Sequence, residues 1–170
     1  MRKFPQKFPR MLWCLVFILF FSSHAWGMSQ ELVGRMGLGF SNELVNGIPT
    51  FSIKMQRSSA FAFGALIGFK NSDQNGGLGA GLRFYRILFD EPLLNFFAAG
   101  TAAMISAKTA DSATSGFQFD FTLGSEFHFT GLESLGFSIE FGFSVNKLYD
   151  QFTLETVGRH MLQAGIHFYL

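Results

Sequence analysis

The chain has 170 residues, enough for one domain, and is 48% hydrophobic and 17% aromatic but only 15% charged. This composition excludes a disordered chain, which would be poor in aromatic residues and rich in charge. A formal net charge of +1 gives no electrostatic basis for binding nucleic acid, so we expect no nucleic-acid partner. Because so few charges would cover a water-facing surface poorly, the composition favours a membrane protein.

The first segment has the features of a secretory signal peptide. Four basic residues lie within residues 2–10, the eleven residues 11–21 carry no charge, and small residues follow. A membrane-spanning helix needs about 20 apolar residues, whereas the order basic, apolar, small is typical of an export signal. We predict cleavage after Ala25, which leaves nine basic and twelve acidic residues and a net charge of −3. Cleavage also removes Cys14, the single cysteine, so the remaining domain, residues 26–170, can form no disulfide.

After the signal, apolar and polar residues alternate with period two. In residues 117–129, Phe117, Phe119 and Phe121 share one parity with further apolar residues, and polar residues occupy the other. A β-strand sends successive side chains to opposite faces, so this pattern predicts a strand with one apolar face. The faces of one segment, 94–107, stay unassigned because its parity is ambiguous. The predicted strands are 35–40, 51–56, 61–69, 78–85, 94–107, 117–129, 137–146 and 161–170.

Eight successive strands without a helical period predict an all-β protein, an eight-stranded antiparallel up-and-down transmembrane β-barrel. The connections 58–59, 90–93 and 130–135 are short, as periplasmic turns are, and we expect longer outer loops at 71–76, 109–115 and 149–156. A soluble barrel would show the same alternation with the apolar face inward. The polar face here is rich in glycine, serine and threonine, and the other is crowded with phenylalanine, so the membrane barrel is favoured.

The last eight residues resemble the C-terminal β-signal of outer-membrane proteins. Gln163, Gly165, Phe168 and Leu170 occupy its polar, glycine and hydrophobic positions, with Leu170 in place of the usual phenylalanine. The strand number and the chain length are similar to those of the small OmpA/OmpX-type barrels. This resemblance implies export to the periplasm and residence in the outer membrane of a Gram-negative bacterium. It also implies contact with outer-membrane lipid and lipopolysaccharide, and with periplasmic chaperones and the barrel assembly machinery.

Lys54, Arg83, Glu126 and Glu140 are charged residues with the inward parity of the predicted strands. A hairpin centred near Glu133 would set Glu126 directly opposite Glu140. Like charges in that position are destabilising, and an unpaired carboxylate in a narrow barrel would protonate, so cations must lie nearby. We therefore predict a lumen charge layer of two acids and two bases in the periplasmic half. The acid–base cluster in the lumen of OmpA-type barrels is similar, and such a layer would close the channel.

Two patterns could suggest a cofactor or a metal ion, but neither is specific. The glycine-rich run 76–81 would need a following helix to bind phosphate, whereas residues 82–85 continue as a strand. Glu126 and His128 could ligate a metal with Glu140, but polar side chains that fill a barrel interior would look the same. We expect no cofactor.

The sequence favours a non-enzymatic barrel with a structural or interaction role in the cell envelope. The alternative is a lipid A-modifying outer-membrane enzyme of the acyltransferase or deacylase type. Ser112, Ser115, Asp150 and His160 are predicted on the outer side and could form its site, but no motif of those enzymes surrounds them. An open diffusion pore is not expected, because water-filled channels appear in barrels of roughly 16 strands.

Overall fold

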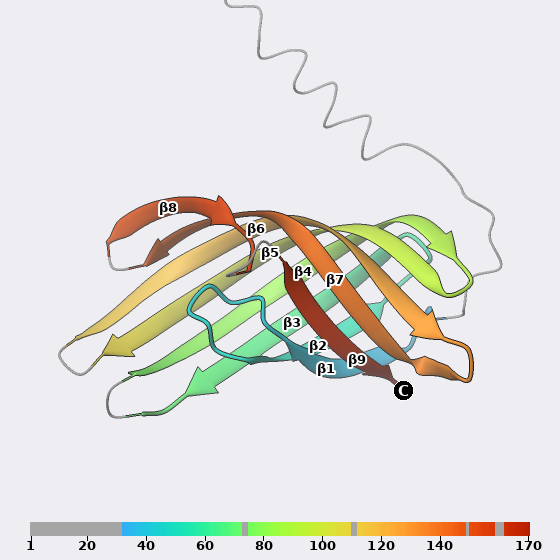
Figure 1. Ribbon diagram of the computed structural model, residues 1–170, viewed down its shortest axis with the longest axis horizontal. Helices are drawn as coiled ribbons and strands as arrows, with labels where there is room; N and C mark the ends of the chain where they lie inside the picture. The colour runs from blue at the N-terminus through green and yellow to red at the C-terminus, as the bar shows by residue number, and fades with distance from the viewer. Residues whose placement is uncertain (1–31, 73–74, 110–111, 149, 159–161) are drawn as a thin grey trace, which may run out of the picture.

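The computed structural model describes residues 32–72, 75–109, 112–148, 150–158 and 162–170, so the predicted signal peptide, residues 1–25, lies outside the described residues. None of the described residues belongs to a helix long and apolar enough to cross a membrane. The strands (Figure 1) are β1 (Met36–Ser41), β2 (Thr50–Gln56), β3 (Phe61–Lys70), β4 (Asn75–Glu91), β5 (Leu94–Thr109), β6 (Ala113–Phe129), β7 (Leu132–Leu148), β8 (Gln151–Thr156) and β9 (Gln163–Tyr169).

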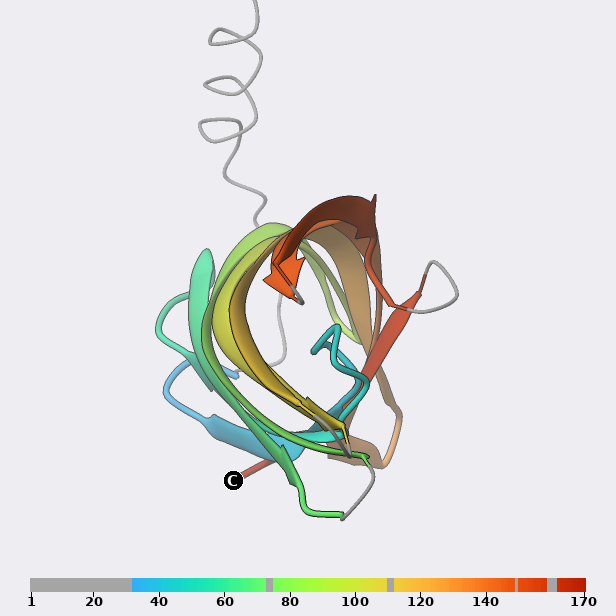
Figure 2. The ribbon, with the colours of Figure 1, turned by 90° about the vertical axis from the view of Figure 1, so that its left-hand side faces the viewer.

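These strands form one closed antiparallel barrel, seen as a ring in Figure 2. From β1 to β7 each strand pairs with the next, and β9 closes the ring between β7 and β1. The last part of β7 pairs with β8 and its earlier part with β9, so β8 and β9 together occupy the eighth position. The predicted eight-stranded antiparallel barrel is confirmed, with its eighth strand divided in two.

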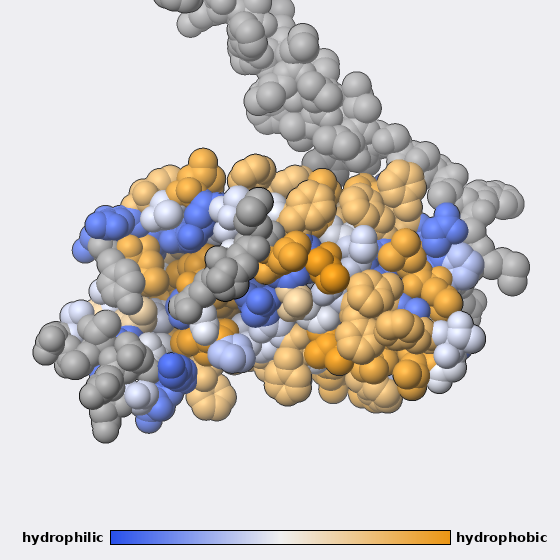
Figure 3. Space-filling model, viewed as in Figure 1, coloured by the Kyte–Doolittle hydropathy of each residue, from blue (hydrophilic) through white to orange (hydrophobic). Residues whose placement is uncertain are grey.

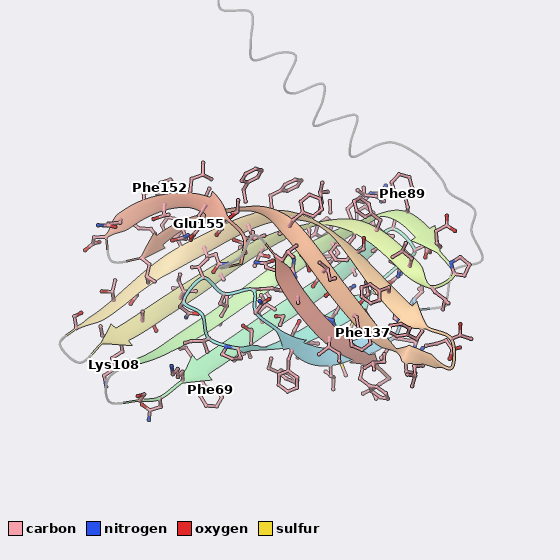
Figure 4. The ribbon with its side chains drawn as sticks, in the orientation of Figure 1. Phe69, Phe89, Lys108, Phe137, Phe152 and Glu155 are labelled. Carbon is pink, nitrogen blue, oxygen red and sulfur yellow. The ribbon has the colours of Figure 1, made fainter. Side chains whose placement is uncertain are left out.

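The two faces of the sheet are as the alternation predicts. Polar residues point into the barrel and are buried, whereas large apolar residues are exposed on the outside, the reverse of a soluble barrel. Figure 3 shows apolar side chains gathered along the barrel, with polar residues toward its two ends, and Figure 4 labels Phe69, Phe89 and Phe152 around the exterior. The structure also assigns the ambiguous strand β5, in which Phe97 and Thr101 face inward and Met104 faces outward.

The connections differ from the expected pattern of short turns on one side and long loops on the other. Residues 113–115 and 151–156, expected in loops, belong to β6 and β8. The backbone forms the hydrogen bonds of the ladder, so pairing continues past the point where apolar residues end. The longest connection is instead residues 42–49, between β1 and β2. We call this segment the coil and the end of the barrel at which it lies the coil end. The opposite end of the barrel, where Leu170 lies, is the C-terminal end.

The register of the β6–β7 hairpin also differs from the prediction. The turn lies at residues 130–131, and beside it a bulge inserts residues 133–135 into β7, so that the register moves from Phe129 opposite Leu132 to His128 opposite Gly136. Glu126 therefore pairs with Ser138, two positions away from Glu140. The predicted opposition of Glu126 and Glu140 is wrong, because the bulge adds residues to only one of the two strands.

The barrel wall is interrupted at the coil end. After Ser41 the chain leaves the sheet, and Figure 2 shows the coil inside the ring of strands. If β1 had continued in the wall, it would have run beside β8. Among the described residues, β8 pairs with β7 alone. The wall is thus complete at the C-terminal end and lacks one strand contact at the coil end.

Candidate functional site

A cluster around Lys54 fills the C-terminal half of the lumen. Lys54 Nζ donates to Glu126 Oε2 at 2.6 Å, and Tyr169 Oη donates to Glu126 Oε1 at 2.7 Å. The Lys54 ammonium also lies 4.7 Å from the centre of the Tyr85 ring and 5.1 Å from that of Phe97. All five side chains are buried, so these neighbouring groups take the place of solvent around the charged pair.

A second cluster forms around Arg83. Its guanidinium donates to both carboxylate oxygens of Glu140, at 3.1 and 2.6 Å, and lies 4.7 Å from the Tyr85 ring centre. Thr122 Oγ1 donates to Glu140 Oε2 at 2.7 Å. Arg83 Nη1 also donates to Glu43, which reaches it from the coil. The two-pronged contact with Glu140 fixes the plane of the guanidinium across the lumen.

The four residues of the predicted charge layer thus lie in the lumen as two ion pairs, Lys54 with Glu126 and Arg83 with Glu140. Both cations lie against the Tyr85 ring. Sequence reasoning missed Glu43, because it belongs to a connection and has no strand parity. It also missed Tyr169, whose inward parity was visible but whose hydroxyl was not considered as a hydrogen-bond donor.

The coil fills the other half of the lumen with apolar side chains. Leu44 and Ile48 are buried, and Leu44 belongs to a cluster with Leu66 and Ile105. The facing strands provide the room with glycine: a Cβ on Gly79 would lie 2.2 Å from Leu44 Cδ1. Gly77 and Gly68 similarly border Ile48. The glycine-rich run 76–81 therefore makes space for an inserted segment, a role that the alternation alone did not reveal.

Polar contacts hold the backbone of the coil in place. Gln118 Nε2 donates to Glu43 O at 2.8 Å and Gln118 Oε1 accepts from Val45 N at 2.9 Å. Asn46 Nδ2 donates to two strand carbonyl oxygens, of Leu78 at 3.3 Å and Ser106 at 3.2 Å. The backbone of the coil thus finds partners inside the barrel, as a buried irregular segment must.

Burial raises the pKa of the Glu43 carboxyl to about 7, although the Arg83 guanidinium lowers it. The carboxylates of Glu140 and Asp120 raise the pKa further. Arg83 is thus shared between Glu43 and Glu140, and the lumen contains more acids than it can pair. A proton on Glu43 relieves this excess of negative charge.

The three residues considered as metal ligands are bound to other protein groups. Glu126 and Glu140 form the ion pairs above, and His128 Nδ1 lies 3.0 Å from Glu133 O. In the part of the chain that the structure describes, no group of three or more histidine, cysteine, aspartate or glutamate residues could hold a metal ion.

A serine–histidine–glutamate arrangement also lies in the lumen. Ser52 Oγ is 2.9 Å from His167 Nε2, and His167 Nδ1 is 3.9 Å from Glu126 Oε1. Ser52 and Glu126 are completely buried and His167 nearly so. A substrate cannot reach this serine, so we interpret the three residues as part of the packed interior.

The residues considered for the alternative enzyme site are Ser112, Ser115, Asp150 and His160. Ser115 lies on the outward parity of β6 and is exposed, and Ser112 lies just before that strand. The Asp150 carboxylate, also exposed, is 3.4 Å from Lys147 Nζ. His160 lies outside the described residues.

The residues of the C-terminal pattern lie in the strand that closes the barrel and in the residue after it. Gln163 points into the lumen, where its Nε2 donates to Glu43 O at 3.3 Å, and Gly165 pairs with Ser41 on one side and Ser138 on the other. Phe168 and Leu170 are exposed on the outside.

No protein-family model matches the sequence, and no curated protein shows significant similarity to it. Among solved structures, the chain is similar to the N-terminal β-barrel domain of OprF from Pseudomonas aeruginosa, with a TM-score of 0.60 and 11% sequence identity. The match covers 81% of this chain and 98% of that domain. At this identity, the likeness concerns the course of the backbone. The chain therefore has the eight-stranded antiparallel fold of the OprF barrel, in agreement with the resemblance to OmpA-type barrels.

Proposed function

We propose that this protein is a non-enzymatic β-barrel of the bacterial outer membrane, with a structural or interaction role in the cell envelope. The observation that carries the proposal is the distribution of side chains across one sheet. Phenylalanine and aliphatic residues cover the outside, whereas the ion pairs of Lys54 and Arg83 lie inside. An exposed apolar belt of this kind suits lipid and would aggregate in water.

Two features of the sequence support the outer membrane as the destination. The predicted signal peptide, residues 1–25, would deliver the chain to the periplasm. The C-terminal pattern of Gln163, Gly165, Phe168 and Leu170 would then be read by the barrel assembly machinery, after periplasmic chaperones have kept the chain unfolded. In the membrane, the apolar belt would contact lipid and lipopolysaccharide.

A closed lumen supports a structural role in preference to transport. The C-terminal half is filled by the two ion-pair clusters and the coil half by Leu44 and Ile48. Eight strands enclose just enough room for side chains, and here a backbone segment shares that room. We expect the purified barrel to conduct no ions in planar bilayers.

Mobility on gels tests the location and the architecture. In outer-membrane fractions, the unheated protein should run at a different position from the boiled protein, because a folded barrel stays compact in detergent until heated. Intact-mass measurement should show a chain that begins near residue 26. A protein found only in soluble fractions, or one that retains Met1, would contradict the proposal.

A deletion strain should show altered envelope permeability but unchanged lipid A mass spectra. A change in lipid A would instead favour the enzyme alternative.

A further inference from the structure

The interruption of the barrel wall contains a cavity. It lies between the end of β8 and the coil and has a volume of about 250 Å³. One side is formed by residues 42–45 and 47–49 of the coil and the other by Glu155, Thr156, Gly158 and Leu162. We call this opening the side cleft.

The side cleft adjoins the apolar outside of the barrel. Leu162 lines it and is 53% exposed, and Leu154, on the same outward face of β8 as Thr156, is 67% exposed. Phe40, at the end of β1 nearest the coil, is 62% exposed. Within the side cleft, Leu44, Ile48 and other apolar residues of the coil continue this surface inward. An apolar chain could therefore pass from the outside of the barrel into the side cleft along Leu162 and the apolar residues of the coil.

The charges of the side cleft restrict what can enter it. Two of the lining residues, Glu43 and Glu155, are acidic. Glu43 is directed to Arg83 in the lumen, and Glu155 Oε1 accepts a hydrogen bond from Asn146 Nδ2 at 2.7 Å. No basic residue is among the described residues that line the side cleft. Among these described residues a phosphate group would find no cationic partner, whereas a neutral acyl chain needs none.

The edge of β8 provides a reason for an occupant. On the side away from β7, no described strand pairs with β8, and lipid offers no hydrogen bonds to a free strand edge. We propose that the side cleft binds one acyl chain of a membrane lipid, with the linkage carbonyl accepting from the edge of β8 and the anionic or zwitterionic head remaining outside. This inference rests on the proposed membrane location of the barrel.

Native mass spectrometry tests the proposal. The full mature chain is refolded into vesicles of phosphatidylethanolamine and phosphatidylglycerol, extracted in mild detergent and examined for retained phospholipid. We expect one phospholipid per barrel. Leu162→Trp and Thr156→Trp should each reduce retention at least fivefold, because both narrow the side cleft from exposed positions that tolerate a larger side chain. Phe152→Trp is the matched control, since it adds an indole to the outward face of β8 away from the cleft, and it should retain the lipid.

A second set of vesicles distinguishes the chain from the head group. Phosphatidylcholine, which has the same acyl chains and no net charge, should be retained at least as well as phosphatidylglycerol. Retention of phosphatidylglycerol alone would overturn the assignment of the acyl chain. Equal retention by the parent and both cleft variants, or none by a heat-modifiable parent, would overturn the proposal. A dimer formed by the parent but not by Leu162→Trp or Thr156→Trp would overturn the proposal. It would indicate instead that β8 pairs with a second copy of the chain. Failure of the parent to enter vesicles would instead contradict the proposed membrane location.

Discussion

Leu44 occupies the space that a side chain at position 79 would need. A Cβ on Gly79 would lie 2.2 Å from Leu44 Cδ1, closer than two carbon atoms can approach. The two residues lie on different segments, Leu44 in the inserted coil and Gly79 on the inner face of β4. Insertion of the coil and the absence of a side chain at position 79 therefore depend on each other.

Gly79→Val should destabilise the barrel by about 1–3 kcal/mol, because the new side chain overpacks the site of Leu44. Leu44→Ala opens that site, so the double variant should be more stable than the sum of the single effects predicts. Urea titrations in detergent, followed by gel mobility, measure all four free energies of unfolding. Additive effects would show that Leu44 and Gly79 do not meet.

Phe121→Arg should cost about 2–4 kcal/mol if residue 121 lies near the middle of the bilayer. The side chain is exposed on the outward face of β6. Ser115→Arg is the matched control: it lies on the same face of the same strand, nearer the coil end, and should cost about 0–1 kcal/mol. The measurement is refolding stability in lipid vesicles. Equal costs at the two positions would contradict the assigned lipid-facing belt.

Arg83→Met and Glu140→Gln should each cost about 3–5 kcal/mol, because each leaves a buried polar group without its partner. The double variant should lose less than the sum, since neither charge then remains to be paired, with a coupling of about 0.5–3 kcal/mol. Urea titrations in detergent measure the free energies of unfolding of the parent, the two single variants and the double variant. Strict additivity would mean that the two charges do not interact.

Glu43 should make the barrel less stable as the pH rises from about 4.5 to 7. The pKa of Glu43 is 4.5 in an unfolded chain and about 7 in the folded one, so in this window the folded state binds more protons. Stability therefore falls with rising pH, by at most about 1.4 kcal/mol per pH unit. Glu43→Gln removes the titrating group, and its unfolding free energy should show a smaller decrease across the window. Parallel pH profiles of the parent and the variant would contradict this prediction.

The alternation of side chains made the strands and their faces predictable, because each face meets a different environment along its whole length. Residues 117–129 of β6 show this most clearly. The register of the hairpin was not predictable. Pairing at Glu126 depends on the bulge at residues 133–135, and nothing in the alternation marks an insertion in one strand of the hairpin.

The candidate site was predictable only where it lies on strands. Lys54, Arg83, Glu126 and Glu140 have inward parity, so their shared location followed from the strand assignments. The contribution of Glu43 depends on the path of the coil, which no periodic pattern determines. Two local signs were present: apolar residues in an irregular segment, and small residues on the strands that face it.

The first and last described strands, β1 and β9, meet in the closed barrel, and this sets the order in which the barrel can be completed. Arg35 Nη2, just before β1, donates to Tyr169 O at 2.7 Å, and Leu170 N donates to Met36 O at 3.0 Å. The contact between Arg35 and Tyr169 spans 134 residues of sequence, so loop closure is costly and slow relative to each hairpin. Until the last seven-residue strand arrives, β1 and β7 both present free edges. Loss of these final residues would leave an open sheet rather than a slightly smaller barrel.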